Sequence, residues 1–208
     1  MLQIIPALLV AITVVIQCLA VQMSRYRLSR MNARPPHHGL ALMSGMLAPP
    51  AIILRLYQND SAVGVLFMTI MTGCMTLMTL TDAASCRLPR PFTIMYLISG
   101  SAFRLWQGDW LTGLCSAGFW FLLLLLFRQY TSYRRKTETI GLGDVFLIAG
   151  IAIWSPPGDI PWIVATAAGG ALLYLWCNRQ RRITRELPFG PFLCASQYAF
   201  TFYPGGLW

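Results

Sequence analysis

Charged residues are scarce in this sequence. Asp, Glu, Lys and Arg make up 11% of its 208 residues, whereas a soluble globular domain carries about 25%. Hydrophobic residues make up 56%, and apolar runs of roughly 15–20 residues, about the length that crosses a bilayer, recur along the chain. The alternating pattern of a β-barrel is missing, and irregular backbone cannot face lipid. We therefore predict an all-α, polytopic integral membrane protein.

Paired cysteines are missing as well. The six cysteines form no Cys-x-x-Cys pair, and five of them lie inside apolar runs. Zinc sites and disulfide frameworks depend on paired spacings, so we predict neither and expect no metal site. The sequence also lacks internal repeats, low-complexity linkers and any loop long enough to fold by itself. Residues 1–208 are therefore predicted to form a single membrane domain.

The apolar runs predict about eight transmembrane helices. They cover approximately residues 2–22, 39–57, 62–80, 92–106, 110–127, 142–154, 160–177 and 189–203. Pro49 and Pro50 interrupt the second run, which we expect to be kinked or broken. The sixth run is short, so we expect it to be tilted, to be partly buried by neighbouring helices, or to continue into its flanks.

The distribution of basic residues is an internal check on this count. Eight spans place 14 of the 16 Lys and Arg residues on one side and leave only Arg55 and Arg104 on the other. Basic loops are retained in the cytoplasm, so both chain termini are predicted to lie outside it. The net charge of +9 is explained by this excess of basic residues on the cytoplasmic side. We therefore predict no nucleic-acid partner.

The stretch Gly141-Leu142-Gly143-Asp144 opens the sixth apolar run after a basic loop. An ionisable residue at the mouth of a membrane span is a candidate functional residue because its burial is costly. We expect Gly141 and Gly143 to permit close backbone approach and unusual φ and ψ angles beside Asp144.

A second acid, Asp82, ends the third apolar run, and the eight-span topology puts it at the same cytoplasmic face as Asp144. Two carboxyl groups that share a site do not both ionise easily, so one stays protonated near neutral pH, as an aspartic protease requires. Negative charge is disfavoured at the C-terminal end of a helix and favoured at the N-terminal end. Our hypothesis is that Asp82 holds the proton and Asp144 acts as the base. The non-enzymatic alternative is a small transporter or assembly factor that uses these acids to carry protons.

Three motifs resemble those of the type 4 prepilin peptidase family and come in the family's order. They are the Asp82 stretch that ends in Arg87-Leu88-Pro89, Gly141-Leu142-Gly143-Asp144, and Leu187-Pro188-Phe189-Gly190-Pro191-Phe192-Leu193. The similarity covers roughly residues 62–208. The resemblance implies a Gly-x-Gly-Asp aspartic endopeptidase of the bacterial inner membrane, with Asp82 and Asp144 as the catalytic pair and with both termini periplasmic.

The resemblance also implies partners and cofactors. The substrates would be prepilins or pseudopilins of a type IV pilus or type II secretion system, cut on the cytoplasmic side after a Gly, among membrane lipids. Many family members also methylate the new N-terminus with S-adenosylmethionine and carry an insert with two Cys-x-x-Cys pairs after the first span. This chain resembles a short form without that insert, so S-adenosylmethionine is expected only if methylation is retained, and proteolysis needs no cofactor. The alternative is another Gly-x-Gly-Asp protease that acts on other signal peptides.

Two interpretations of Pro188-Phe189-Gly190-Pro191 stay open. The prolines interrupt helix hydrogen bonding and so free backbone groups that could pair with an extended substrate strand. Alternatively, they mark the start of a helix. These four residues, together with Gly141 and Gly143, are predicted to bind substrate or shape the site.

Overall fold

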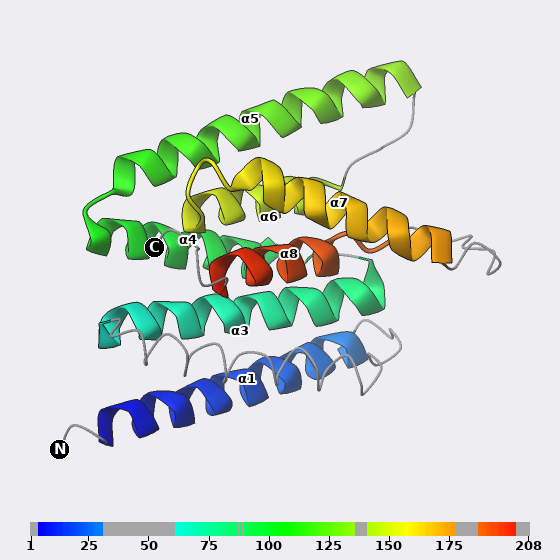
Figure 1. Cartoon of the computed structure of the whole chain (residues 1–208). Helices are drawn as coiled ribbons and strands as arrows, with labels where there is room; N and C mark the ends of the chain where they lie inside the picture. Colours follow the sequence, from blue (N-terminus) through cyan, green and yellow to red (C-terminus); the bar gives the residue numbers. More distant parts are fainter. Residues whose placement is uncertain are drawn as a thin grey trace. The chain divides into compact units, whose positions relative to one another are not determined.

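The computed structural model describes residues 4–30, 61–86, 88, 90–135, 141–177 and 187–202. This part of the chain forms only α-helices, which confirms the predicted all-α class (Figure 1). The helices are α1 (Ile4–Arg30), α3 (Ala62–Ser85), α4 (Arg90–Gln107), α5 (Trp110–Arg135), α6 (Leu142–Trp154), α7 (Ile160–Cys177) and α8 (Gly190–Phe202). Each overlaps one predicted span, but α1 and α5 continue to residues 30 and 135, beyond the predicted ends at 22 and 127. The remaining predicted span, 39–57, lies outside the described residues.

Four of the described helices, α1, α3, α5 and α7, are long and apolar enough to cross a membrane. The chain therefore has the character of a multi-pass membrane protein, while the total of eight spans stays a prediction. The chain divides into two compact units, Met1–Arg87 and Leu88–Trp208. The prediction of one domain over the whole chain is not tested by this division.

The first unit contains a pair of parallel helices, α1 and α3, joined by buried polar side chains. Thr13 Oγ1 lies 3.1 Å from Thr69 Oγ1. One turn further along α1, the Gln17 side chain donates to Thr72 Oγ1 at 3.0 Å and accepts from Thr76 Oγ1 at 2.8 Å. Lipid is as apolar as these helices, so hydrogen bonds and close packing, rather than a hydrophobic force, hold such a pair together.

The second unit is built around α6, which α4, α5, α7 and α8 all contact. Nine of the 13 residues of α6 are buried, as is typical of a helix that is hydrophobic on every side. A helix of this length is about 20 Å long, shorter than the roughly 30 Å hydrocarbon core of a bilayer. The neighbouring helices bury most of it, which is one of the alternatives that the short sixth run left open.

Two glycines allow α4 and α6 to pack closely. A Cβ atom added to Gly150 would lie 2.6 Å from the Tyr96 ring, and one added to Gly100 would lie 2.8 Å from the Trp154 ring. Trp154 Nε1 donates to the Tyr96 carbonyl at 3.1 Å. The Tyr96 hydroxyl in turn donates to Gln197 Oε1 of α8 at 2.5 Å. Tyr96 thus connects the three helices α4, α6 and α8.

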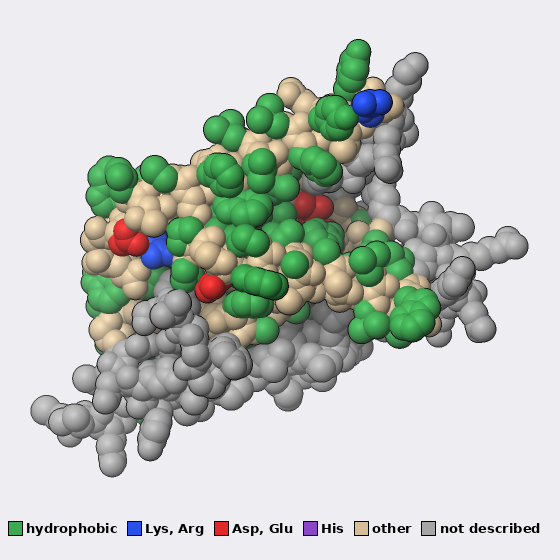
Figure 2. Space-filling view, turned by 45° about the horizontal axis from the view of Figure 1, so that its top comes forward, with side chains coloured by type: hydrophobic (Ala, Val, Ile, Leu, Met, Phe, Trp, Pro, Cys, Tyr) green, Lys and Arg blue, Asp and Glu red, His purple; other side chains and the backbone are tan. Residues whose placement is uncertain are grey.

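The outer helices α5 and α7 expose large apolar side chains, which cover much of the face seen in Figure 2. Aromatic residues are exposed near both ends of each helix; they are Trp110, Tyr130 and Tyr133 on α5, and Trp162, Tyr174 and Trp176 on α7. Trp and Tyr are enriched where a membrane protein meets the two bilayer surfaces. This face therefore has the composition of a lipid-facing surface.

Candidate active site

Asp82 lies in the last turn of α3, inside the first unit. It is only 4% exposed, and it is the one acid classed as buried among the described residues. Its carbonyl accepts a hydrogen bond from the Cys86 amide at 2.7 Å, and Cys86 ends the helix with a left-handed φ of 50°. Asp82 thus combines burial with the helix end where the dipole disfavours negative charge.

Asp144 lies in the first turn of α6, inside the second unit, and is half-buried. Its amide donates to the Gly141 carbonyl at 3.1 Å, and Gly141 is the residue that caps the helix N-terminus. The carboxylate folds back over this glycine, because a Cβ atom at position 141 would lie 3.2 Å from Asp144 Oδ2. A helix N-terminus favours a negative charge at this point.

The prediction of unusual backbone angles at the two glycines was wrong. Gly141 has a φ of −63° and a ψ of 136°, which any residue adopts, and Gly143 is an ordinary helical residue of α6 without a positive φ. Close approach does occur, but the nearest atoms belong to side chains, those of Asp144 at Gly141 and of Leu88 at Gly143, and not to another backbone. Space for neighbouring atoms, and not backbone freedom, is therefore what glycine supplies at these positions.

Gly143 makes room for Leu88, the residue that opens the second unit. A Cβ atom added to Gly143 would lie 2.8 Å from Leu88 Cβ, closer than real Cβ atoms approach. Leu88 belongs to the Arg-Leu-Pro stretch that follows Asp82 in the sequence. The two glycines of Gly-x-Gly-Asp thus leave space for different groups: Gly141 for the Asp144 carboxylate, and Gly143 for the Leu88 side chain.

The Pro-Phe-Gly-Pro segment leads into α8. Pro188 and Phe189 precede the helix, whereas Gly190 and Pro191 lie in its first turn. The Phe189 carbonyl accepts hydrogen bonds from the amides of Phe192 and Leu193, at 3.1 and 3.2 Å. A proline in the first turn costs no hydrogen bond, because that turn has no acceptor for its amide. The local structure is the predicted helix start, and a role for the segment in substrate binding stays a prediction.

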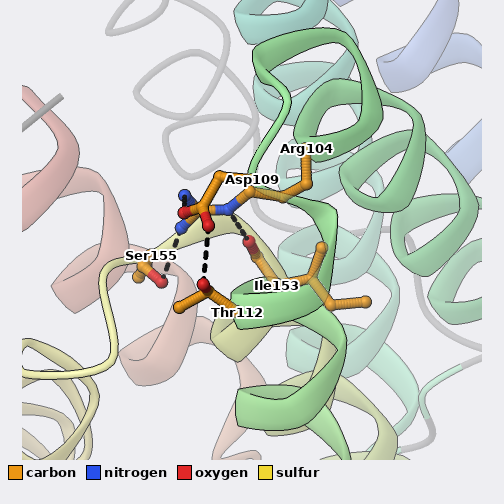
Figure 3. A network of polar contacts seen from close by, with 5 residues as sticks. All are labelled: Arg104, Asp109, Thr112, Ile153 and Ser155. Carbon is orange, nitrogen blue, oxygen red and sulfur yellow. Dashed lines mark hydrogen bonds and ion pairs between the residues drawn. The ribbon is translucent and has the colours of Figure 1, made fainter.

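Sequence reasoning missed two residues that shape this region. Leu88 was noticed only as part of a motif, and Arg104 only as an exception to the charge distribution. Arg104 is nearly buried and donates hydrogen bonds to carbonyls at the far end of α6 (Figure 3). The sequence did contain a signal that Arg104 is buried and paired. It lies inside an apolar run, and an acid, Asp109, follows five residues later.

Comparisons with known proteins agree with the motifs. The model of the type IV leader peptidase family matches residues 69–176, a range that includes Asp82 and Asp144. Two curated proteins named prepilin leader peptidase/N-methyltransferase, from Burkholderia pseudomallei strains 1026b and K96243, are each 32% identical over 175 residues. The alignment covers 79% of this chain and 53% of each relative, so the chain spans about half the length of the curated relatives it matches.

No solved structure matches this chain. The family match extends over more than half of the sequence, and the chain therefore belongs to the type IV leader peptidase family.

Proposed function

We propose that this chain is a membrane aspartic endopeptidase that removes the leader peptide of type IV prepilins or pseudopilins, with Asp82 and Asp144 as its catalytic pair. Family membership supports the reaction class. The two acids support the chemistry, because each lies at the end of an apolar helix, Asp82 buried and Asp144 half-buried.

The observation that supports a site around Asp144 is the contact between Leu88 and Gly143, which lies inside the second unit. Leu88 follows Asp82 by six residues, and Gly143 directly precedes Asp144. Leu88, from the motif that begins at Asp82, therefore packs inside the second unit beside the turn that carries Asp144.

In the proposed reaction the ionised aspartate takes a proton from water, and the resulting hydroxide attacks the scissile carbonyl carbon. The protonated aspartate donates a hydrogen bond to the carbonyl oxygen. When the tetrahedral intermediate collapses, the carbon–nitrogen bond breaks and the leaving amine receives a proton from the pair. We assign the base to Asp144 at a helix N-terminus and the proton to Asp82 at a helix C-terminus. Infrared titration of Asp82→Asn and Asp144→Asn variants tests this assignment, which fails if Asp144 is the acid still protonated at neutral pH.

The proposed substrate has a short basic leader, a Gly before the cleaved bond and an apolar stem helix. We place the cleavage at the cytoplasmic face of the bacterial inner membrane, in a type IV pilus or type II secretion pathway, with both termini periplasmic. The charge distribution supports this orientation, because most Lys and Arg residues fall on the side that carries Asp82 and Asp144.

The relatives' name also includes an N-methyltransferase activity. We propose proteolysis for this chain and treat methylation with S-adenosylmethionine as a separate hypothesis. Mass spectrometry of the product N-terminus, with and without S-adenosylmethionine, tests methylation independently of cleavage.

Co-expression with a candidate prepilin tests the proposed function. The wild-type chain should shorten the prepilin, as seen by gel shift and N-terminal sequencing, whereas Asp82→Asn and Asp144→Asn should leave it uncut. Asp159→Asn is the matched control, because Asp159 precedes α7 and Asn serves as well as Asp at a helix start.

A prepilin whose Gly before the cleaved bond is replaced should resist cleavage, and continued cleavage would favour a protease for other signal peptides. If prepilin is never cut but the Asp variants impair transport, the proton-carrying alternative is favoured.

A further inference from the structure

Arg104, near the C-terminal end of α4, is a charged residue in an apolar setting. Its side chain is 9% exposed, and a charge held in such a place is costly unless its donors are satisfied. A Cβ atom added to Gly113 of α5 would lie 2.9 Å from Arg104 Cγ, so this glycine provides the space through which the arginine stem passes. Gly113 therefore leaves the space that the Arg104 side chain occupies.

The guanidinium group binds the C-terminal end of α6 (Figure 3). Nε donates to the Ile153 carbonyl at 2.8 Å, and Nη2 donates to the Ser155 carbonyl at 3.0 Å. The last carbonyls of a helix have no partner within the helix, and the planar fork of arginine reaches two acceptors in a fixed geometry, which lysine cannot do. Arg104 therefore satisfies this helix end and fixes its position.

Two further residues orient the guanidinium. Arg104 Nη1 lies 3.4 Å from Asp109 Oδ2, and Asp109 Oδ1 accepts a hydrogen bond from Thr112 at 2.6 Å. The Asp109 side chain is 52% exposed, so its ion pair contributes little free energy. The carbonyls of Ile153 and Ser155, by contrast, belong to buried residues at the end of α6.

We propose that Arg104 is a positioning residue for Asp144. Arg104 of α4 contacts the C-terminal end of α6, and Asp144 lies in the first turn of the same helix. This helix is about 20 Å long, and most of its residues are buried. Fixing the C-terminal end of α6 against α4 and α5 sets how far its N-terminal turn, with Asp144, projects toward the substrate. The contacts of Arg104 with α6 are independent of the catalytic assignment, but the role in positioning rests on the proposed function.

The test uses the full chain in liposomes with a synthetic prepilin. Arg104→Met removes the guanidinium and keeps an apolar stem, Gly113→Ala crowds the stem without removing the charge, and Arg104→Lys is the conservative variant. Arg134→Met is the matched control, because Arg134 is exposed near the end of α5 and its only described contact is with the Tyr130 ring. Hydrogen–deuterium exchange of the α6 amides is measured in every variant.

Arg104→Met should lower kcat by about 10- to 100-fold, the cost of displacing a catalytic group by about 1 Å, with KM changed by less than about threefold. Gly113→Ala and Arg104→Lys should fall between Arg104→Met and the wild type. Exchange should rise in the C-terminal half of α6 in Arg104→Met and stay unchanged in Arg134→Met. A folded Arg104→Met variant with wild-type kcat would overturn the proposal, as would a rise in KM alone.

If the wild-type chain itself cuts no prepilin, the proposed function fails. The exchange data then test separately whether Arg104 anchors the C-terminal end of α6. Faster exchange at the C-terminal half of α6 in Arg104→Met would then uphold the anchoring of α6 by Arg104. Unchanged exchange there would refute it.

Discussion

Leu88 packs against Gly143 so closely that no side chain fits at position 143, where a Cβ atom would lie 2.8 Å from Leu88 Cβ. Both residues lie in the second unit, and the contact puts Leu88 beside the turn that carries Asp144. At position 143 the need for glycine is steric, whereas at position 141 an added Cβ atom would crowd the Asp144 carboxylate at 3.2 Å.

Gly143→Ala should therefore damage cleavage even though alanine favours a helix. The added methyl group forces Leu88 or the Asp144 turn to move, and a shift of about 1 Å should lower kcat by at least about tenfold. Steady-state cleavage of a synthetic prepilin measures the effect.

Gly118→Ala is the matched control for this prediction, because Gly118 is an exposed residue of α5 with nothing within 4 Å of an added Cβ atom. Its cleavage rate should equal that of the wild type. Leu88→Gly, which removes the clashing Cβ atom, should restore part of the rate in the Gly143→Ala background. Wild-type kinetics in Gly143→Ala would show that the contact does not matter for catalysis.

Gly141→Ala should lower the cleavage activity without lowering the stability of the fold. The backbone angles at Gly141 suit alanine, so the unfolding temperature should not fall. The new Cβ atom would lie 3.2 Å from Asp144 Oδ2 and would displace the carboxylate, so kcat should fall by about tenfold. Loss of stability together with activity would contradict the steric role assigned to this glycine.

Tyr96→Phe should destabilise the second unit by about 1 kcal/mol, because the Gln197 oxygen loses a buried donor. Unfolding in a detergent series measures the change, and Tyr133→Phe at an 86% exposed position serves as the control. The double variant Tyr96→Phe, Gln197→Leu removes both partners and should cost less than the sum of the single changes. Strict additivity would mean that the hydrogen bond contributes nothing.

The sequence was sufficient to predict approximately where the helices of the described chain lie, and it singled out two acids whose catalytic role stays a prediction. Long apolar runs have few alternatives to a helix in lipid, and a carboxyl group at the end of such a run is conspicuous because it is costly there. The start of α8 at Gly190 was one of the two interpretations that the prolines left open.

Side-chain contacts between distant segments could not be predicted in the same way. Leu88 and Arg104 owe their roles to partners in α6 or directly after it. No local sequence pattern indicates which residues of two distant segments will be in contact. The angles at Gly141 were mispredicted for a related reason, since glycine serves either for conformational freedom or for space, and only the neighbouring atoms distinguish the two.

The central claim is that Asp82 and Asp144 act as one catalytic unit. The most direct measurement is the single-turnover cleavage rate of a synthetic prepilin by the full chain in liposomes, for the wild type, Asp82→Asn, Asp144→Asn and the double variant. Residues that act together are not additive, so all three variants should show the same background rate, while Asp159→Asn cuts like the wild type. Cleavage near the wild-type rate by either single variant would contradict the account.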